Sequence, residues 1–162
     1  MTILDASPDG AELPGFAAGD VDNDGQQEML VGSDTQLTWY RPSTNESGVI
    51  GKGHIACGVV VDDIDGDGQN EVACGLKEDG VEKIVWFKKT GDEWKRYDVD
   101  TACTGHAHDL LCVDIDGDGE KELVANAAYC PVWGVFVYKK GADVTQPWQK
   151  ATVQTGVSEE GL

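Results

Sequence analysis

The sequence predicts an all-β chain made of three similar units, each a four-stranded antiparallel sheet. Three observations support this prediction. A nine-residue acidic segment occurs three times, beginning at Asp20, Asp63 and Asp114, so successive copies start 43 and 51 residues apart. Short segments rich in β-branched and aromatic residues flank every copy, as is typical of strands. No stretch of about twelve or more residues shows the period of a helix.

Each acidic segment lies between two short apolar segments, which we expect to form a hairpin. The strands before the acidic segments are predicted at residues 15–19, 57–61 and 110–113. The strands after them are predicted at residues 29–32, 72–75 and 123–126. In this arrangement the acidic segment is the turn of the hairpin, and a cation bound there would organise that turn.

A third and a fourth strand complete each unit. The third strands, which carry the aromatic residues, are predicted at 36–40, 83–87 and 134–138. Fourth strands are predicted at 94–99 and 148–153, whereas the first unit offers only a stub at 48–50. Four short antiparallel strands repeated every 40 to 50 residues or so are typical of a β-propeller blade.

If each unit is a propeller blade, the boundaries of the blades follow for the whole chain. Residues 1–162 form one β-propeller segment with blades at approximately 12–53, 54–104 and 105–156, and residues 1–11 form the outer strand of a neighbouring blade. Propellers close with about four to eight blades, so three cannot complete a ring. The segment therefore belongs to a longer chain, assembles with other copies of itself, or forms an open array with exposed edges.

The acidic segments have the spacing of a calcium-binding loop. Carboxylates stand at positions one, three, five and nine, and a glycine at position six permits a sharp bend, as in the first half of an EF-hand loop. Position twelve lacks the EF-hand glutamate, so position nine supplies the closing carboxylate. The side-chain ligands predicted in this way are Asp20, Asp22, Asp24, Glu28, Asp63, Asp65, Asp67, Glu71, Asp114, Asp116, Asp118 and Glu122. Position seven adds a backbone carbonyl from Gln26, Gln69 and Glu120.

An acidic hairpin turn without a metal is the alternative, because Asp and Gly favour turns in any case. Three copies with four carboxylates in the same register favour a cation, since that much charge in nine residues repels itself strongly. A flexible cage of oxygen atoms suits calcium better than magnesium. We therefore expect about three bound calcium ions, one for each loop.

Composition narrows the classes of partner. The chain has 30 acidic and 12 basic residues and a formal charge of −18, which argues against nucleic acid and against anionic membranes. No segment is apolar enough for membrane insertion, and no secretory signal is visible at the start of the chain. The five cysteines include no Cys-x-x-Cys pair. We expect buried thiols, with one disulfide as the alternative.

The repeated pattern of apolar strand, Asp-x-Asp-x-Asp-Gly-x-x-Glu and apolar strand, as in residues 113–124, resembles the FG-GAP/VCBS repeat family. The resemblance covers about residues 12–156 in three repeats, and the VCBS-like branch is the better match because the Phe-Gly and Gly-Ala-Pro stretches are absent. It implies a calcium ion in each loop. Similar repeats occur in integrin α-chain propellers, in secreted lectins, and in propeller enzymes that act on sugars, so the resemblance also implies an extracellular protein.

The histidines are the remaining candidates for chemistry. His54 and His106 precede predicted inner strands, where the mouth of a propeller channel is expected, and His106 and His108 would share one face of a strand. These three residues and Asp109 are the candidate catalytic or transition-metal residues. A histidine hydrogen-bonded at a turn is the simpler interpretation and the one we favour.

The sequence therefore favours a binding module over an enzyme. The expected role is calcium-dependent recognition of a carbohydrate or a protein outside the cell. An enzymatic alternative is a lyase or dehydratase acting on a sugar or polysaccharide, although the paired acids that glycoside cleavage would need are already assigned to the loops. A second alternative is a self-assembling homo-oligomer in which copies complete the propeller.

Overall fold

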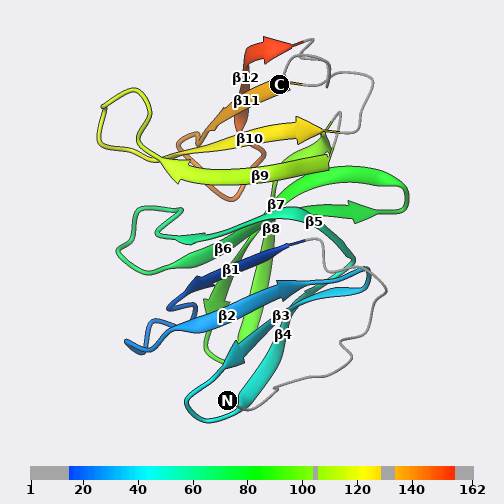
Figure 1. The fold of residues 1–162 in the computed structure, drawn as a ribbon. Coiled ribbons are helices and arrows are strands. Elements are labelled where there is room, and N and C mark those ends of the chain that lie inside the picture. The colour runs from blue at the N-terminus through cyan, green and yellow to red at the C-terminus, as the bar shows by residue number, and fades with distance from the viewer. Residues whose placement is uncertain (1–14, 104–105, 129–133, 156–162) are drawn as a thin grey trace, which may run out of the picture.

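The computed structural model describes residues 15–103, 106–128 and 134–155, and in these parts of the chain every regular element is a β-strand. Twelve strands form three four-stranded antiparallel sheets, which lie one above another (Figure 1). Sheet 1 contains β1 Phe16–Gly19, β2 Glu28–Gly32, β3 Gln36–Arg41 and β4 Glu46–Lys52. Sheet 2 contains β5 His54–Asp62, β6 Glu71–Glu78, β7 Val81–Thr90 and β8 Glu93–Cys103. Sheet 3 contains β9 His106–Val113, β10 Glu122–Ala128, β11 Gly134–Lys139 and β12 Gln149–Thr155.

Each strand pairs with the next one along the chain, so every sheet is a simple meander. The acidic segments join the first strand of each sheet to the second, and the predicted all-β fold and its three hairpins are confirmed. Hereafter loops 1, 2 and 3 are residues 20–27, 63–70 and 114–121. All three loops project from the same side of the stack, the left side in Figure 1.

The prediction of a stub for the fourth strand of the first unit was wrong. Strand β4 has seven residues and pairs with β3 along its length, with Trp39 opposite Gly48. Glycine weakens a strand, which is why the segment looked short in the sequence. A Cβ atom at position 48 would lie 2.7 Å from the indole nitrogen of Trp39, so the glycine is needed for the packing of the tryptophan.

Alternate side chains of the second and third strands fill the space between the sheets. Leu30 and Leu37 of sheet 1 belong to one fully buried cluster with Val72 and Val85 of sheet 2. A second cluster joins sheets 2 and 3, and its members include Ile84, Trp86, Leu123, Phe136 and Tyr138. Because residues i and i+2 of a strand share a face, sheet 2 is apolar on both faces and buried between its neighbours.

The first strands, β1, β5 and β9, lie next to one another and require small residues. A Cβ atom on Gly19 would lie 2.5 Å from Cγ1 of Val61 in the neighbouring sheet. A Cβ atom on Gly58 would lie 2.8 Å from the carbonyl oxygen of Ala107. Glycine therefore sets how closely the inner strands approach each other.

A part-buried polar contact also joins sheets 2 and 3. Asp100 accepts hydrogen bonds from the Tyr138 hydroxyl at 3.0 Å and from the Lys150 ammonium at 2.9 Å. Burial would raise the pKa of Asp100, but these hydrogen bonds and the positive charge of Lys150 outweigh it and lower that pKa. Burial raises the pKa of Tyr138, so its hydroxyl stays a donor.

Cys74 and Cys112 are free thiols. Cys74 and Cys103 are buried and Cys112 is half-buried. Burial raises the pKa of both Cys74 and Cys112 to about 12, which keeps these thiols protonated. The side chains of Cys57 and Cys130 and the strand predicted at residues 1–11 lie outside the described part of the chain. Within the described residues, no helix has the length and apolar character needed to cross a membrane.

Candidate metal centres in the acidic loops

The first aspartate of each loop holds the turn together through backbone hydrogen bonds. In loop 1 the Asp20 carboxylate accepts from the amides of Asp24, at 3.0 Å, and Gly25, at 2.8 Å. The equivalent carboxylates of loops 2 and 3 accept from the amides of Gly68 and Gly119, each at 3.0 Å. All three position-six glycines have a positive φ, between 88° and 93°, which few other residues adopt without strain.

The glutamate at position nine lies beneath its loop. It begins the second strand of the sheet, and one carboxylate oxygen accepts the backbone N–H of position two. The distances are 3.1 Å from Val21 to Glu28, 3.0 Å from Ile64 to Glu71 and 3.1 Å from Ile115 to Glu122. All three glutamates are buried. The second oxygen, Oε1, is left for a cation or for a basic side chain.

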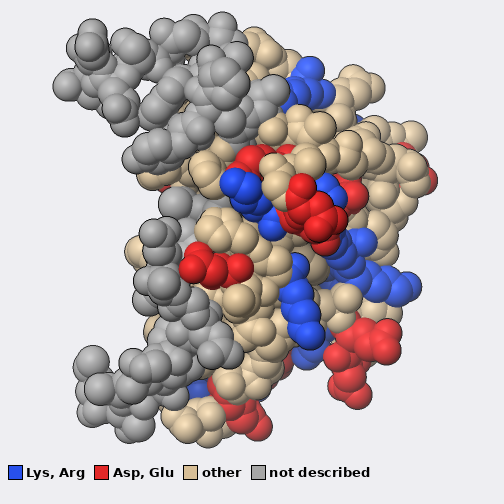
Figure 2. Space-filling model, turned by 90° about the vertical axis from the view of Figure 1, so that its right-hand side faces the viewer, with Lys and Arg blue, Asp and Glu red and all other residues tan. Residues whose placement is uncertain are grey.

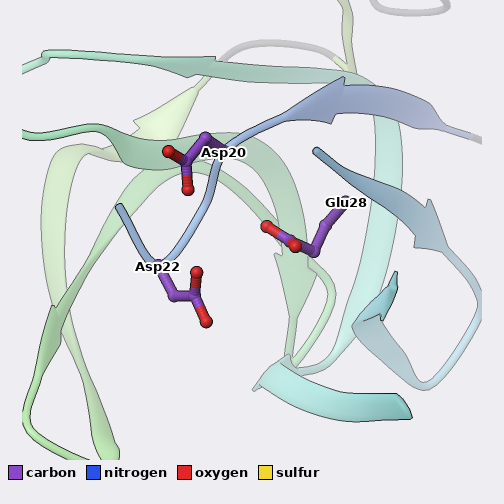
Figure 3. A group of neighbouring side chains, drawn as sticks. All are labelled: Asp20, Asp22 and Glu28. Carbon is purple, nitrogen blue, oxygen red and sulfur yellow. The ribbon is translucent and has the colours of Figure 1, made fainter. Parts of the chain in front are cut away.

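Three of the four predicted carboxylates converge in each loop. Positions one, three and nine each offer an oxygen within 4.8 Å of the others, in the groups Asp20–Asp22–Glu28, Asp63–Asp65–Glu71 and Asp114–Asp116–Glu122. Figure 3 shows the first group, with Glu28 directing its carboxylate from the strand toward the loop that carries the two aspartates. The position-five aspartates, Asp24, Asp67 and Asp118, fall outside these groups. The carbonyl ligands at Gln26, Gln69 and Glu120 stay a prediction.

The sequence reasoning missed a basic side chain at every loop. Arg41 ends β3, Lys88 lies in β7 and Lys139 ends β11, and each contacts several carboxylates of its own hairpin. Hydrogen bonds to Glu28 and Asp22 raise the pKa of Arg41 further. The signal was present in the sequence, because each predicted third strand is followed directly by a basic residue.

Three buried oxygen atoms of the predicted ligands fit a cation. Oδ1 of Asp22, Oε1 of Glu71 and Oε1 of Glu122 accept no hydrogen bond from any described group, and the two glutamate side chains are only 1% exposed. Burial raises the pKa of Glu71, which reflects the cost of keeping that charge away from water. Buried carboxylates need a counter-charge, and a set of oxygen atoms of this kind suits a hard divalent ion.

Neighbouring loops contact each other. Asn23 of loop 1 and Asn70 of loop 2 form reciprocal hydrogen bonds, in which the Asn70 amide donates to the Asn23 side chain at 2.7 Å. Between the next pair of sheets, Lys121 of loop 3 donates to Asp62 at 2.6 Å. Asp62, the last residue of β5, therefore links sheet 2 to loop 3 of sheet 3.

The candidate histidines do not form a single group. His54 and His106 come together from two sheets, with ring centroids 6.4 Å apart, and each Nδ1 faces a carboxylate, Asp34 at 3.1 Å and Glu82 at 3.2 Å. His108 instead lies 3.2 Å from Asp109, its neighbour in the chain. All three histidines lie in strands, at the start of β5 and in β9, and not at turns as the simpler interpretation placed them. A catalytic or metal-binding role for them stays a prediction.

A cavity of about 380 Å³ lies among the three inner strands. Phe16 of β1, Gly58 of β5 and the segment from His108 to Leu111 of β9 line it. Phe16 is 85% exposed and Leu111 is 60% exposed, so the cavity has an apolar wall as well as an acid and an imidazole. Of the candidate residues, His108 and Asp109 line this cavity.

The side of the stack opposite the acidic loops differs in charge pattern. The turn between β6 and β7 projects there (Figure 1), and the view onto this side shows basic and acidic side chains interspersed (Figure 2). Glu78 at the end of β6 contacts Lys83 at 2.7 Å and Arg96 at 3.2 Å. Hydrogen bonds from Arg96 lower the pKa of Glu78 to about 2. The clusters with metal-ligand chemistry in the described chain are those of the loops.

A hairpin repeated in successive sheets, with its turn built from Asp-x-Asp-x-Asp-Gly and closed by a buried glutamate, defines a class of repeat protein. The family model described as FG-GAP-like repeat matches residues 20–74 and 63–125. These matches cover more than half of the chain, so the protein belongs to the FG-GAP-like repeat family. No curated protein matches the chain.

Proposed function

We propose that this chain is a calcium-stabilised β-propeller segment that serves as a binding module outside the cell. The observation that carries the calcium proposal is the threefold convergence of two aspartates and a buried glutamate within 4.8 Å. The buried Oε1 atoms of Glu71 and Glu122 accept no hydrogen bond from the described residues, and burying a charged oxygen in this way costs free energy unless a cation lies beside it. A dication would provide the counter-charge that these oxygens need.

Calcium suits the loops better than magnesium. The ligands are carboxylates on a glycine-containing turn, and calcium accepts six to eight or so oxygen atoms in an irregular arrangement, whereas magnesium requires near-octahedral geometry. In each loop the aspartates at positions one and three and the glutamate at position nine would hold the ion. The bound charge would reduce repulsion and fasten the two strands of the hairpin at the turn.

The test is calcium titration of protein that has been stripped of divalent ions, followed by calorimetry. Saturable binding that magnesium competes for only weakly supports the proposal. Absence of saturable binding at millimolar calcium would refute it. Asp92→Asn is a matched control, because Asp92 is an exposed acid outside the loops and its replacement should leave calcium binding unchanged.

The three sheets are, in this proposal, three consecutive blades of a propeller with further blades on both sides. Sheet 2 turns Val72 and Cys74 toward sheet 1, and the same strand positions in sheet 1 are Met29 and Val31. No described sheet covers that side of sheet 1, yet both residues are apolar, and Met29 is 45% exposed. Terminal repeats of a finished array carry polar outer faces, so the apolar faces support additional blades.

The other end of the stack gives the same indication. Ala73 and Trp86 of sheet 2 pack toward sheet 3, and the matching positions of sheet 3 are Val124 and Val137. The missing blades could come from a longer chain or from a second copy, because the chain carries both complementary faces. Sedimentation equilibrium distinguishes the two sources. A monomer in the presence of calcium would favour a longer chain, and a dimer or larger oligomer would favour a second copy.

The recognition role rests on the family and on the cavity. FG-GAP repeats are typically extracellular, which supports a secreted or surface location. A carbohydrate or a protein segment would meet the apolar wall formed by Phe16 and Leu111 beside the polar pair His108 and Asp109. Screening a glycan array with the calcium-loaded protein tests this role, and Leu111→Asp should abolish any binding found there.

An enzyme acting on sugars is the second candidate, and the contact between His108 and Asp109 in the cavity is the observation that favours it. An imidazole held beside a carboxylate can serve as a general base in a lyase or dehydratase reaction. Incubation with polysaccharides followed by detection of new unsaturated sugar ends would test it. Activity that His108→Ala leaves unchanged would exclude this cavity as the active site.

A further inference from the structure

A basic residue faces the closing glutamate across the hairpin in all three sheets. Met29 pairs with Tyr40, and extending this register by one residue toward the loop places Glu28 of β2 opposite Arg41 of β3. The same register places Lys88 opposite Glu71 and Lys139 opposite Glu122. Directly opposed residues of antiparallel strands have Cβ atoms about 4.5–5.5 Å apart, so these side chains meet wherever the sheet forms. The position is set by the pairing of the strands, not by the acidic loop.

In loop 1 this residue is an arginine that is nearly buried. Arg41 Nε lies 2.8 Å from Glu28 Oε1, and Nη2 lies 2.8 Å from Asp22 and 3.0 Å from Asp24. Its side chain is only 10% exposed. The planar guanidinium contacts three of the four carboxylates in a fixed geometry, including the Glu28 Oε1 atom that a metal ion would need. It leaves Oδ1 of Asp22 as the buried oxygen of this group without a hydrogen bond from the described residues. Lys89 of sheet 2 adds a second positive charge 3.5 Å from Asp22.

In loops 2 and 3 the residue is a lysine, and it is held less firmly. Lys88 contacts Asp65 and Asp67. Its ammonium lies 3.2 Å from Glu71 Oε1 but donates no hydrogen bond to that oxygen. The side chain is 23% exposed. An ammonium on a flexible four-carbon stem can swing into solvent without leaving an unpaired buried donor behind.

Lys139 of loop 3 is the least confined of the three. Its ammonium contacts Asp116 and Asp118 at 2.6 Å each, lies 3.6 Å from Glu122, and is 42% exposed. The contact with the buried glutamate therefore loosens from loop 1 to loop 3, as the exposure of the basic side chain rises. Displacing the basic group should become easier in the same order.

We propose that this cross-strand residue decides which loops bind calcium. Arg41 remains paired with the carboxylates of loop 1 and prevents metal binding there, whereas calcium displaces Lys88 and Lys139 from the carboxylates of loops 2 and 3. A dication in loop 1 would either lie beside the guanidinium or expel it from buried carboxylates, and both are unfavourable. This inference rests on the proposed calcium binding. It lowers the expected number of tightly bound ions from three to two.

The experiment exchanges the basic residues while keeping their charge. Arg41→Lys gives loop 1 the residue of its neighbours, and Lys139→Arg gives loop 3 the residue of loop 1. Calcium titration calorimetry on the stripped proteins should give two ions for the natural sequence, three for Arg41→Lys and one for Lys139→Arg. Circular dichroism of the ion-free proteins verifies that both variants fold, and Lys52→Arg, an exposed lysine outside the loops, controls for the exchange itself.

Amide NMR identifies the loops that respond. The amides of Gly25, Gly68 and Gly119 each donate to the first aspartate of their loop and serve as one reporter for each site. Calcium should shift Gly68 and Gly119 in the natural protein, and should shift Gly25 only in Arg41→Lys. Three equivalent ions in the natural protein, or no gain in Arg41→Lys, would overturn the inference. Binding by none of the proteins would instead refute the proposed calcium function.

Discussion

Removal of calcium should lower the melting temperature of the protein substantially. With its closing glutamate, loop 2 carries four acidic side chains and loop 3 carries five, and each of these glutamates buries an oxygen that accepts no hydrogen bond from the described residues. A ligand that binds only the folded state, at a free concentration of 100 times its dissociation constant, contributes about 2.7 kcal/mol to the free energy of unfolding. Two such sites contribute about 5 kcal/mol together.

This contribution is large for a domain of this size. A change of 1 kcal/mol moves the melting temperature of a chain of about 150–250 residues by about 2–4 °C, so we expect a difference of about 10–20 °C between millimolar calcium and excess chelator. Differential scanning calorimetry at constant ionic strength measures it. The constant ionic strength is necessary because salt alone screens repulsion between the exposed aspartates.

A double substitution provides the matched control. Glu71→Gln combined with Glu122→Gln keeps an oxygen to accept the backbone amides of Ile64 and Ile115, but it removes the charge that faces the loop. The variant should remain folded and should lose most of the calcium-dependent shift in melting temperature. An identical melting temperature of the natural protein in calcium and in chelator would refute the reasoning, as would a full shift in the double variant.

Three further predictions concern single positions. Asp116→Ala should remove one calcium site and leave the other occupied, and loss of all binding in titration calorimetry would contradict separate sites. Gly19→Ala should lower the free energy of unfolding by about 1–3 kcal/mol in urea, because the new methyl group would overlap Val61, whereas Gly141→Ala, with no atom within 4 Å of the added carbon, should be neutral. The lowered pKa of Asp100 adds stability that is present above its ordinary pKa and is lost as pH falls below about 4, so Asp100→Asn should flatten the decline in melting temperature at acid pH; an unchanged decline would count against this contact.

Much of the fold could be predicted because it depends on local patterns. Alternating apolar residues define strands, and the spacing of aspartate and glycine in residues 20–28 defines a tight acidic turn whatever surrounds it. The length of β4 was predicted wrongly because the prediction used local patterns alone. The glycine at position 48 weakens a strand by itself, and its function becomes apparent only when Trp39 of the neighbouring strand lies across it.

The candidate site was predicted less completely, because its chemistry depends on contacts between strands. Spacing along the chain places the aspartates on one loop, but the pairing of β2 with β3 brings Arg41 against Glu28. The histidines show the same limit. Spacing along the chain grouped His106 with His108, but in the structure the ring of His106 lies near that of His54, which belongs to another sheet.

The sequence by itself determined the strands, the three acidic turns and the presence of four carboxylates in each, because those properties follow from the order of residues within about ten positions. The tertiary structure alone decided which carboxylate oxygens converge, which glutamate oxygen faces the loop, and which basic side chain competes for it. These outcomes depend on register and on packing between sheets, where a shift of one residue turns a side chain to the opposite face.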